Sequence, residues 1–286
     1  MNIKIAGASG FLGKIVSGKL EAEGHKISAI SRELLYGSIN NLMDYLSGTD
    51  VVINLAGAPI IKRWTSGNKK EIYSSRIITT KNIALAIKKI PAQERPQKVL
   101  SASAIGIYSP CKRHTEISVD YENGFIGNLV AKWEAAWLEL PEETDLSIFR
   151  IGLVLGKKAR LIKNLSTIFK LGIGGKIGTG KQPFPFIHEK DLARAFSFVL
   201  KRFHGKRIIN LVAPQQIDNS HFVKVFAKKL NKPALIPVPS FALKILFGKS
   251  AGLLTQSPAV IPGFLQSENF TFYYPTIEDT LKEILE

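Results

Sequence analysis

Short apolar stretches alternate with amphipathic segments over the first half of the chain. Runs of strand length lie at 3–6, 25–30, 50–57, 98–103 and 146–154. Segments in which apolar residues recur every three or four positions lie at 14–23, 68–90 and 125–140. Strands that alternate with helices in this way favour an α/β fold with a doubly wound parallel sheet, in which ligands gather at the carboxyl ends of the strands.

The first apolar run leads directly into glycines at positions 7, 10 and 13, and the third of these lies inside the next predicted helix. Gly7 lets the chain turn off the strand, Gly10 leaves room for a pyrophosphate, and Gly13 permits close packing of the helix. The N–H groups at the start of this helix, near Phe11 and Leu12, suit an anion. The unit predicts dinucleotide binding and a Rossmann-like fold; an ordinary strand–helix turn is the alternative.

The end of the second strand predicts which dinucleotide binds. Ser31 and Arg32 follow that strand, and Arg32 lies nineteen residues past Gly13, where the adenosine ribose is read. An NAD site places a carboxylate there, whereas a guanidinium suits a 2′-phosphate. NADP is therefore the predicted cofactor. In the alternative, Glu33 takes the ribose and Arg32 is a solvated cation.

The pattern changes after residue 155. A glycine-rich stretch at 172–180 lies within a predicted substrate-side insertion at about 156–190, and it forms either a loop over a substrate or a surface hairpin. Residues 1–236 are predicted to form the nucleotide-binding domain and residues 237–286 a small helical C-terminal region. A basic amphipathic segment, Phe241 to Leu254, favours a docked helix over binding to a membrane surface.

Composition limits the other function classes. With 286 residues the chain can bury a substantial core, and its one cysteine, Cys111, excludes an internal disulfide. Five scattered histidines predict no metal site. The first strand begins almost at Met1 and no apolar run has the length of a membrane span, so we expect a cytoplasmic protein with no membrane partner.

The formal net charge of +16 suits polyanions. The basic residues of the chain occur in pairs spread along its length, without interleaved aromatics or a basic tail. This distribution favours solvated helix faces and an anionic cofactor over a nucleic-acid partner.

Several motifs together resemble one superfamily. They are Gly-Ala-Ser-Gly-Phe-Leu-Gly at 7–13, Asn-Leu-Ala-Gly-Ala-Pro-Ile at 54–60, Arg63-Trp64-Thr65, Ser75-Arg76, Ser-Ala-Ser-Ala-Ile-Gly-Ile-Tyr at 101–108, Trp133-Glu134, and Ile187-His188 with Asp191-Leu192. The chain is similar to extended and atypical short-chain dehydrogenases/reductases, which use NAD(P) on nucleotide sugars and related alcohols or ketones. More narrowly it resembles bacterial and mitochondrial "epimerase family proteins", which carry a C-terminal domain of unknown function, here about 237–284.

The catalytic pattern of that superfamily is incomplete here. Its members pair a serine after the fourth strand with Tyr-x-x-x-Lys on the next helix, because hydride transfer at an alcohol carbon requires proton transfer at its oxygen. Ser103 matches the serine, but the tyrosine and lysine positions hold Ile126 and Val130. Tyr108 is a candidate replacement, its pKa shifted by Lys132 or Lys181; the alternative is that Tyr108 is an aromatic wall.

The remaining candidates lie near the predicted strand ends. Cofactor contacts are expected from Gly7, Gly10, Phe11, Leu12, Gly13, Arg32, Ala56, Gly57, Arg76, Ser101, Ile151, Gly152 and Leu153. Substrate contacts are expected from Arg63, Trp64, Lys181 and His188. Loop anchoring by Trp64 and a structural role for His188 remain alternatives.

The leading hypothesis is an NADP(H)-binding atypical short-chain oxidoreductase or nucleotide-sugar-epimerase-like enzyme. Its substrate would be a small carbonyl compound or sugar derivative, and the basic side chains suit an anionic substrate. The missing Tyr-x-x-x-Lys supports a second hypothesis, a non-catalytic NADP(H)-responsive sensor, and the charge alone supports a third, an RNA-associated protein. The oligomeric state stays open.

Overall fold

A computed structural model describes residues 1–234 and 237–286. Six parallel strands form the central sheet in the order β2-β1-β3-β4-β6-β9. The strands are β1 (Asn2–Ala6), β2 (Lys26–Ile30), β3 (Val51–Asn54), β4 (Lys98–Ala104), β6 (Asp145–Ile151) and β9 (Arg207–Leu211). The predicted doubly wound α/β fold is confirmed, and all the carboxyl ends of these strands meet at one edge of the sheet.

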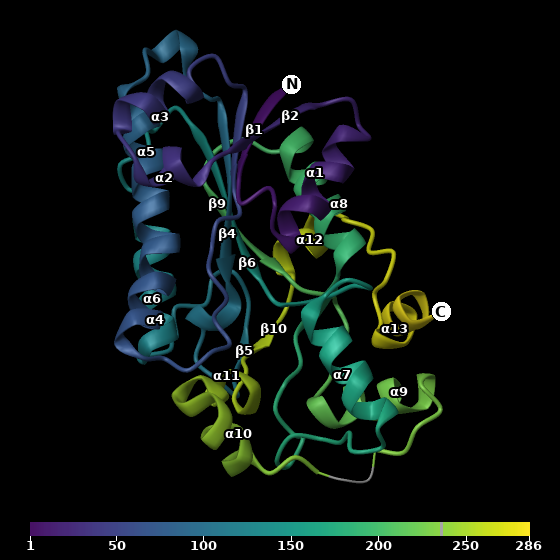
Figure 1. Ribbon diagram of the computed structural model, residues 1–286. Coiled ribbons are helices and arrows are strands. Elements are labelled where there is room, and N and C mark those ends of the chain that lie inside the picture. The colour runs from purple at the N-terminus through teal and green to yellow at the C-terminus, as the bar shows by residue number, and fades with distance from the viewer. Residues whose placement is uncertain (235–236) are drawn as a thin grey trace.

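Helices cover both faces of the sheet (Figure 1). α1 (Phe11–Glu21), α8 (Glu189–Arg202) and α12 (Gly263–Ser267) lie on one face. The opposite face carries α2 (Arg32–Tyr36), α3 (Ile39–Leu46), α4 (Ser66–Tyr73), α5 (Thr79–Lys89) and α6 (Phe125–Ala135). The inner strands β3, β4 and β6 are buried along almost their whole length because each face of the sheet is covered.

Two predicted elements are divided in the structure. The run predicted as one strand over 146–154 ends in the sheet at Ile151, and β7 (Leu153–Leu155) pairs instead with β8 (Phe186–His188) outside the main sheet. The predicted helix over 68–90 is interrupted by a π-helical turn, η1 (Ser74–Ile78), between α4 and α5. Hydrophobic periodicity does not register either break, because apolar residues lie on both sides of each: Ile151 and Leu153 at the first, Ile72 and Ile77 at the second.

Some short elements were not predicted. Besides α2 and α3 they are the turns η2 (Ala92–Glu94), η3 (Ile105–Ile107) and η4 (Gly248–Ala251), and the strands β5 (Arg113–His114) and β10 (Ala259–Val260). β10 pairs with β5, so a C-terminal strand lies beside a segment that follows β4.

The remaining helices form a second part of the molecule next to the sheet edge (Figure 1). They are α7 (Arg160–Lys170), α9 (Asn219–Lys229), α10 (Ser240–Phe247), α11 (Gly252–Thr255) and α13 (Ile277–Leu285). The glycine-rich stretch 172–180 is tied to the C-terminal region, because Ile177 forms an isolated parallel bridge with Val238.

The C-terminal region is anchored to the sheet. The buried Asp191 carboxylate of α8 accepts the backbone N–H groups of Tyr273 at 2.9 Å and Tyr274 at 2.8 Å, and α13 packs against α9. The predicted boundary between 236 and 237 adjoins 235–236, which lie outside the described residues. Among the described helices, none has both the length and the apolar character that a membrane crossing demands.

Candidate active site

The glycine loop after β1 leaves no room for a side chain at Gly7 or at Gly13. Gly7 has φ +80°, and a Cβ on it would lie 2.7 Å from the Leu55 carbonyl oxygen. A Cβ on Gly13 would lie 2.2 Å from the Gly7 carbonyl oxygen, which is below any allowed contact. The loop therefore turns against β3 and against α1 at once, as a dinucleotide-binding turn requires.

The start of α1 has the donors that an anion needs. Gly10 is the N-cap and, having no side chain, supplies no capping hydrogen bond to the first turn. Its N–H groups, at Phe11, Leu12 and Gly13, have no acceptors within the helix. Together with the space left at Gly10, where a Cβ would meet only the Gly7 oxygen at 3.3 Å, these donors fit a pyrophosphate.

The end of β2 presents Arg32 to solvent at the first residue of α2. Ser31 caps this helix by accepting the Leu34 N–H at 3.3 Å. The Arg32 guanidinium lies 5.8 Å from the Tyr36 ring centroid and forms no ion pair with a carboxylate in the part of the chain that the structure describes. Glu33 is also exposed, and hydrogen bonds to its own backbone and to Ser31 lower its pKa. The side chain predicted to read a 2′-phosphate is accessible.

The end of β3 passes beside the glycine loop. Ala56 donates its N–H to the Asn54 side chain at 3.2 Å, and Ala58 donates its N–H to Ser75 Oγ at 2.9 Å. A Cβ on Gly57 would lie 3.2 Å from the Arg76 guanidinium carbon, so Arg76 covers this glycine. The structure thus brings Ala56, Gly57 and Arg76 together, next to Gly7.

A buried polar network links the ends of β4 and β6 to α6. Ser103 Oγ, near the end of β4, donates to Glu134 Oε1 of α6 at 2.6 Å. Arg150 of β6 donates to both oxygens of the same carboxylate, from Nε at 2.8 Å and from Nη2 at 2.7 Å. The side chain of Arg150 is 1% exposed and that of Glu134 12%. Because Ser103 pairs with Arg150 in the β4–β6 register, the three groups form one rigid unit.

Tyr108 belongs to this network as a structural partner. Its hydroxyl donates to Asn210 Oδ1 at 2.8 Å and accepts from Arg150 Nη1 at 2.9 Å. Burial raises the pKa of Tyr108, and the cation beside it is Arg150. Arg150, and not the expected Lys132 or Lys181, is the cation that acts on this tyrosine, and the hydroxyl hydrogen is already donated to Asn210.

At the end of β6 the chain leaves the sheet at the residues predicted to border the cofactor. Gly152 donates its N–H to the Leu211 oxygen at 3.2 Å, and Leu153 to the Pro185 oxygen at 2.8 Å. Ile151 is 8% exposed at the same edge. Ser101 differs from the prediction, because it is buried and its hydroxyl accepts from Trp137 Nε1 at 3.0 Å. Ser101 is a packing contact between β4 and the chain after α6.

The predicted substrate residues differ in exposure and in their contacts. Arg63 is exposed on the loop before α4 and donates to the Ile245 oxygen of α10. Trp64 donates to the Ile60 oxygen at 3.1 Å and packs on Phe125, which supports the loop-anchor alternative.

Lys181 is exposed on the loop before β8. His188 is fully buried, caps α8 by accepting the Lys190 N–H, and bonds Glu283 of α13 at 2.8 Å. Burial lowers the pKa of His188, and its predicted contact with substrate is replaced by a structural role.

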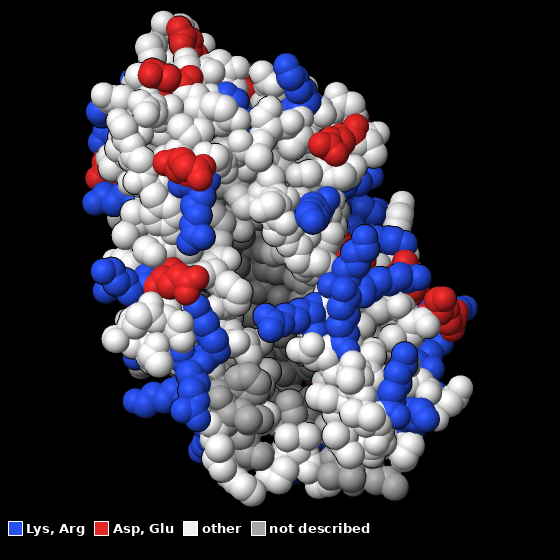
Figure 2. Space-filling model, in the orientation of Figure 1, with Lys and Arg blue, Asp and Glu red and all other residues white. Residues whose placement is uncertain are grey.

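The sheet edge opens into a hollow. Figure 2 shows it between the part of the molecule that carries α4 and α6 and the part that carries α7, with Lys and Arg side chains on both sides. This surface suits an anionic ligand.

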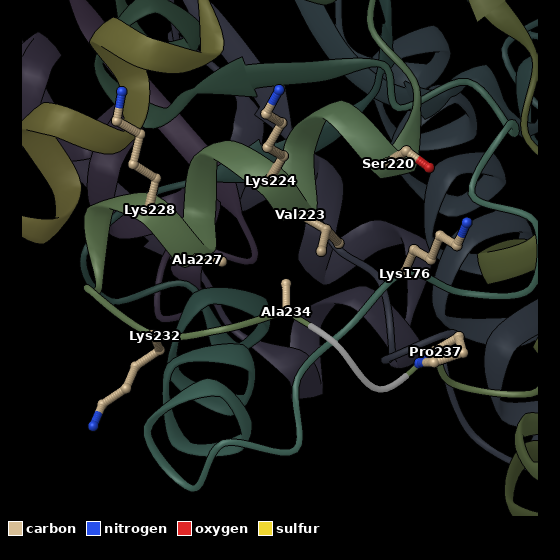
Figure 3. Close-up of a pocket in the computed structure, with 9 residues that line it drawn as sticks. All are labelled: Lys176, Ser220, Val223, Lys224, Ala227, Lys228, Lys232, Ala234 and Pro237. Carbon is tan, nitrogen blue, oxygen red and sulfur yellow. The ribbon is translucent and has the colours of Figure 1, made fainter.

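A separate cavity of about 360 Å³ lies between α9 and the segment that includes Lys232, Ala234 and Pro237 (Figure 3). It contains none of the predicted site residues. Figure 3 shows the ammonium groups of Lys224 and Lys228 on the side of α9 away from Ala234, so these lysines do not converge on one point in it.

Sequence reasoning assigned no role to Glu134 or Arg150. The pair Trp133-Glu134 was visible as a motif, but only contact with Ser103 and Arg150 shows what the glutamate does. Among residues 1–234 and 237–286, no group of three or more His, Cys, Asp or Glu side chains could hold a metal ion.

The parallel sheet, the glycine loop and the polar residues at the ends of β2, β3, β4 and β6 define a Rossmann-like protein with a nucleotide-type site. The chain belongs to the NAD dependent epimerase/dehydratase family, whose model matches residues 3–211, and a domain of unknown function matches residues 238–284. It is 34% identical over 294 residues to the mouse epimerase family protein SDR39U1, covering the whole of both chains.

Other relatives agree. Epimerase family protein YfhF of Bacillus subtilis is 30% identical, with 100% of this chain and 98% of that protein covered. The crystal structure of human SDR39U1 (isoform 2) with NADPH superposes with a TM-score of 0.91 at 33% identity, covering 100% of this chain and 99% of that one. The NADPH in that structure agrees with the NADP predicted here from Arg32.

Proposed function

We propose that the protein is an NADP(H)-dependent oxidoreductase or epimerase-like enzyme that acts on a small carbonyl compound or sugar derivative. The observation that carries the proposal is the glycine loop with its uncapped α1 N-terminus, beside an accessible Arg32. Its fit to a dinucleotide follows from the chain itself, and the NADPH of the human relative supports the same cofactor.

The residues that would hold NADP(H) are divided along the sheet edge. The first turn of α1 would bind the pyrophosphate, Arg32 the 2′-phosphate, and residues 151–153 would border the nicotinamide half. When bound, the cofactor supplies hydride exchange with a substrate carbon.

Ser103 and Glu134 supply the proton chemistry in this proposal. The Ser103 hydroxyl hydrogen is directed at Glu134, so Ser103 Oγ is left as an acceptor for a substrate hydroxyl. In alcohol oxidation the substrate hydroxyl would give its proton to Ser103 Oγ while the Ser103 hydrogen moves along the 2.6 Å hydrogen bond to the Glu134 carboxylate. In carbonyl reduction the same two transfers would run in reverse, from a protonated Glu134 through Ser103 to the substrate oxygen. Arg150 positions that carboxylate through two hydrogen bonds and keeps its charge paired.

A second candidate is a non-catalytic protein that reports the redox state of NADP(H). It is favoured by Ile126 and Val130, which are buried and apolar where the superfamily has its tyrosine and lysine. The engagement of Tyr108 by Arg150 and Asn210 favours it as well.

Calorimetric titration with NADPH and NADH tests the cofactor assignment. Arg32→Ala should remove the preference for NADPH and leave NADH binding unchanged, because only the 2′-phosphate contact is lost. Lys26→Ala is the matched control, since Lys26 is an exposed cation at the other end of the same strand. If the wild-type protein binds neither nucleotide, the enzyme and the sensor proposals both fail.

Turnover separates the two candidates. NADPH oxidation is followed by the loss of its absorbance at ~340 nm, with a panel of aldehydes, ketones and keto sugars as substrates. The enzyme proposal expects oxidation that Ser103→Ala abolishes without weakening NADPH binding. Tight binding with no oxidation for any member of the panel favours the sensor.

A further inference from the structure

Arg76 is a partly buried cation without a carboxylate partner among the described residues. Among the described residues its guanidinium makes one hydrogen bond, a long contact of 3.4 Å from Nη1 to the Ile72 oxygen. The guanidinium carbon lies 5.3 Å from the centre of the Trp133 ring. Burial lowers the pKa of Arg76 to about 10, and no acidic group offsets it. A guanidinium with five N–H donors is thus left with most of its hydrogen-bonding capacity unused.

The backbone places this cation close to the glycine loop. Arg76 lies in the π-helical turn η1, and such turns are frequent at functional sites. The neighbouring Ser75 binds the Ala58 N–H at 2.9 Å, which ties the turn to the chain after β3. That chain touches Gly7 through Leu55, and Gly57 lies directly under the guanidinium.

The position of Arg76 along the sheet edge indicates which phosphate group of a dinucleotide it would contact. β3 lies between β1, which carries the glycine loop, and β4, which carries Ser103. Arg32 is at the end of β2, on the far side of β1, so it is placed for the adenosine ribose. The group expected between these two regions is the pyrophosphate at the first turn of α1.

We infer that Arg76 binds the dinucleotide pyrophosphate, as a second charge contact independent of the 2′-phosphate contact of Arg32. The inference rests on the proposed nucleotide binding. It assigns the two arginines separate tasks: Arg76 contributes to affinity for NADPH and NADH alike, and Arg32 to the choice between them. Charge-assisted hydrogen bonds from a guanidinium to phosphate oxygens also supply the partner that Arg76 lacks.

Three ligands in calorimetric titrations distinguish the tasks: NADPH, NADH and adenosine 2′-monophosphate, which has no pyrophosphate. Arg76→Met keeps the length of the side chain and removes its charge. We expect it to weaken NADPH and NADH by the same factor, about tenfold to hundredfold, and to leave adenosine 2′-monophosphate unchanged. Arg32→Met should weaken NADPH and adenosine 2′-monophosphate and spare NADH. Lys81→Met, an exposed change on α5, is the control.

The melting temperature without nucleotide gives a second readout. An arginine held for a ligand contributes no ion pair to the free protein, so Arg76→Met should melt at or above the wild-type temperature. A marked fall would assign Arg76 a structural role and overturn the inference, and Arg76→Lys, which keeps the charge, then shows whether charge or packing is responsible.

Wild-type affinity of Arg76→Met for both dinucleotides, or a loss confined to NADPH, also overturns the inference. Either result leaves the proposed function intact, because that proposal is tested by the wild-type protein's affinity for the two dinucleotides and by its turnover.

Discussion

Three glycines of the α1 region lie in different surroundings, and alanine at each should have a different effect. A Cβ at Gly13 would lie 2.2 Å from the Gly7 oxygen and 2.6 Å from Ala8 Cα, both backbone atoms. At Gly10 the nearest contact is 3.3 Å, and at Gly18, which is exposed within α1, nothing lies within 4 Å.

These distances set the expected magnitudes. Contacts under 3.0 Å essentially never occur, so Gly13→Ala must move the loop by at least about 0.8 Å, the difference between 3.0 and 2.2 Å. Such overpacking costs about 1–3 kcal/mol. Gly10→Ala at the N-cap costs less than about 1 kcal/mol. Gly18→Ala should stabilise the protein by about 0.5–1 kcal/mol, because alanine is the better helix former.

Urea unfolding followed by circular dichroism measures these stabilities, and calorimetry with NADPH measures binding. Gly13→Ala should lose both stability and binding, Gly10→Ala mainly binding, and Gly18→Ala neither. Full NADPH affinity in Gly10→Ala would refute the assignment of the pyrophosphate to this loop. Loss of binding in Gly18→Ala would show that the effects are not local.

Three further outcomes are expected. Glu134→Ala leaves the buried Arg150 guanidinium unpaired and should lower the free energy of unfolding by about 3–5 kcal/mol in urea; a loss under about 1 kcal/mol would mean that the pair is not buried in solution. Tyr108→Phe removes the hydroxyl shared by Arg150 and Asn210 and should lower the free energy of unfolding by about 1–3 kcal/mol while turnover persists. Abolished turnover with unchanged stability would instead show that Tyr108 is a catalytic acid or base. Hydrogen bonds from Lys201, Ser197 and Lys19 lower the pKa of Glu23 from 4.5 to about 2. As the pH falls, the unfolded chain therefore binds the proton before the folded protein does, and the free energy of unfolding decreases from about pH 4.5 toward pH 2. Glu23→Gln should reduce this loss of stability at acidic pH.

Sequence patterns were sufficient for the local features. The apolar runs and the glycine spacing predicted β1, β2, β3, β4 and β6, together with α1 and the turn before it, because backbone conformation and burial of one strand depend on nearby residues. β9 was not among the predicted strands. Arg32 could be placed for the same reason, since its distance from the glycine loop is a distance along the chain. NADPH in a relative of 33% identity agrees with that reasoning.

Only the tertiary structure decided the chemistry beside this loop. Ser103, Glu134 and Arg150 come from β4, α6 and β6, and their contacts exist only once these elements are adjacent. Tyr108 was predicted as a catalytic group, but its hydroxyl is bonded by residues 42 and 102 positions away in the sequence.

The contacts of His188 and Arg76 could not be predicted from the sequence for the same reason. Residue type shows what a side chain can donate or accept, and neighbours along the chain show which element carries it. Whether its partner is Glu283 of α13, as for His188, or no carboxylate of the described chain, as for Arg76, depends on segments brought together by folding. Hydrogen bonding and desolvation act over a few ångströms in space, so the sequence determined the frame and the glycine loop, and the fold determined which polar groups remain available to a ligand.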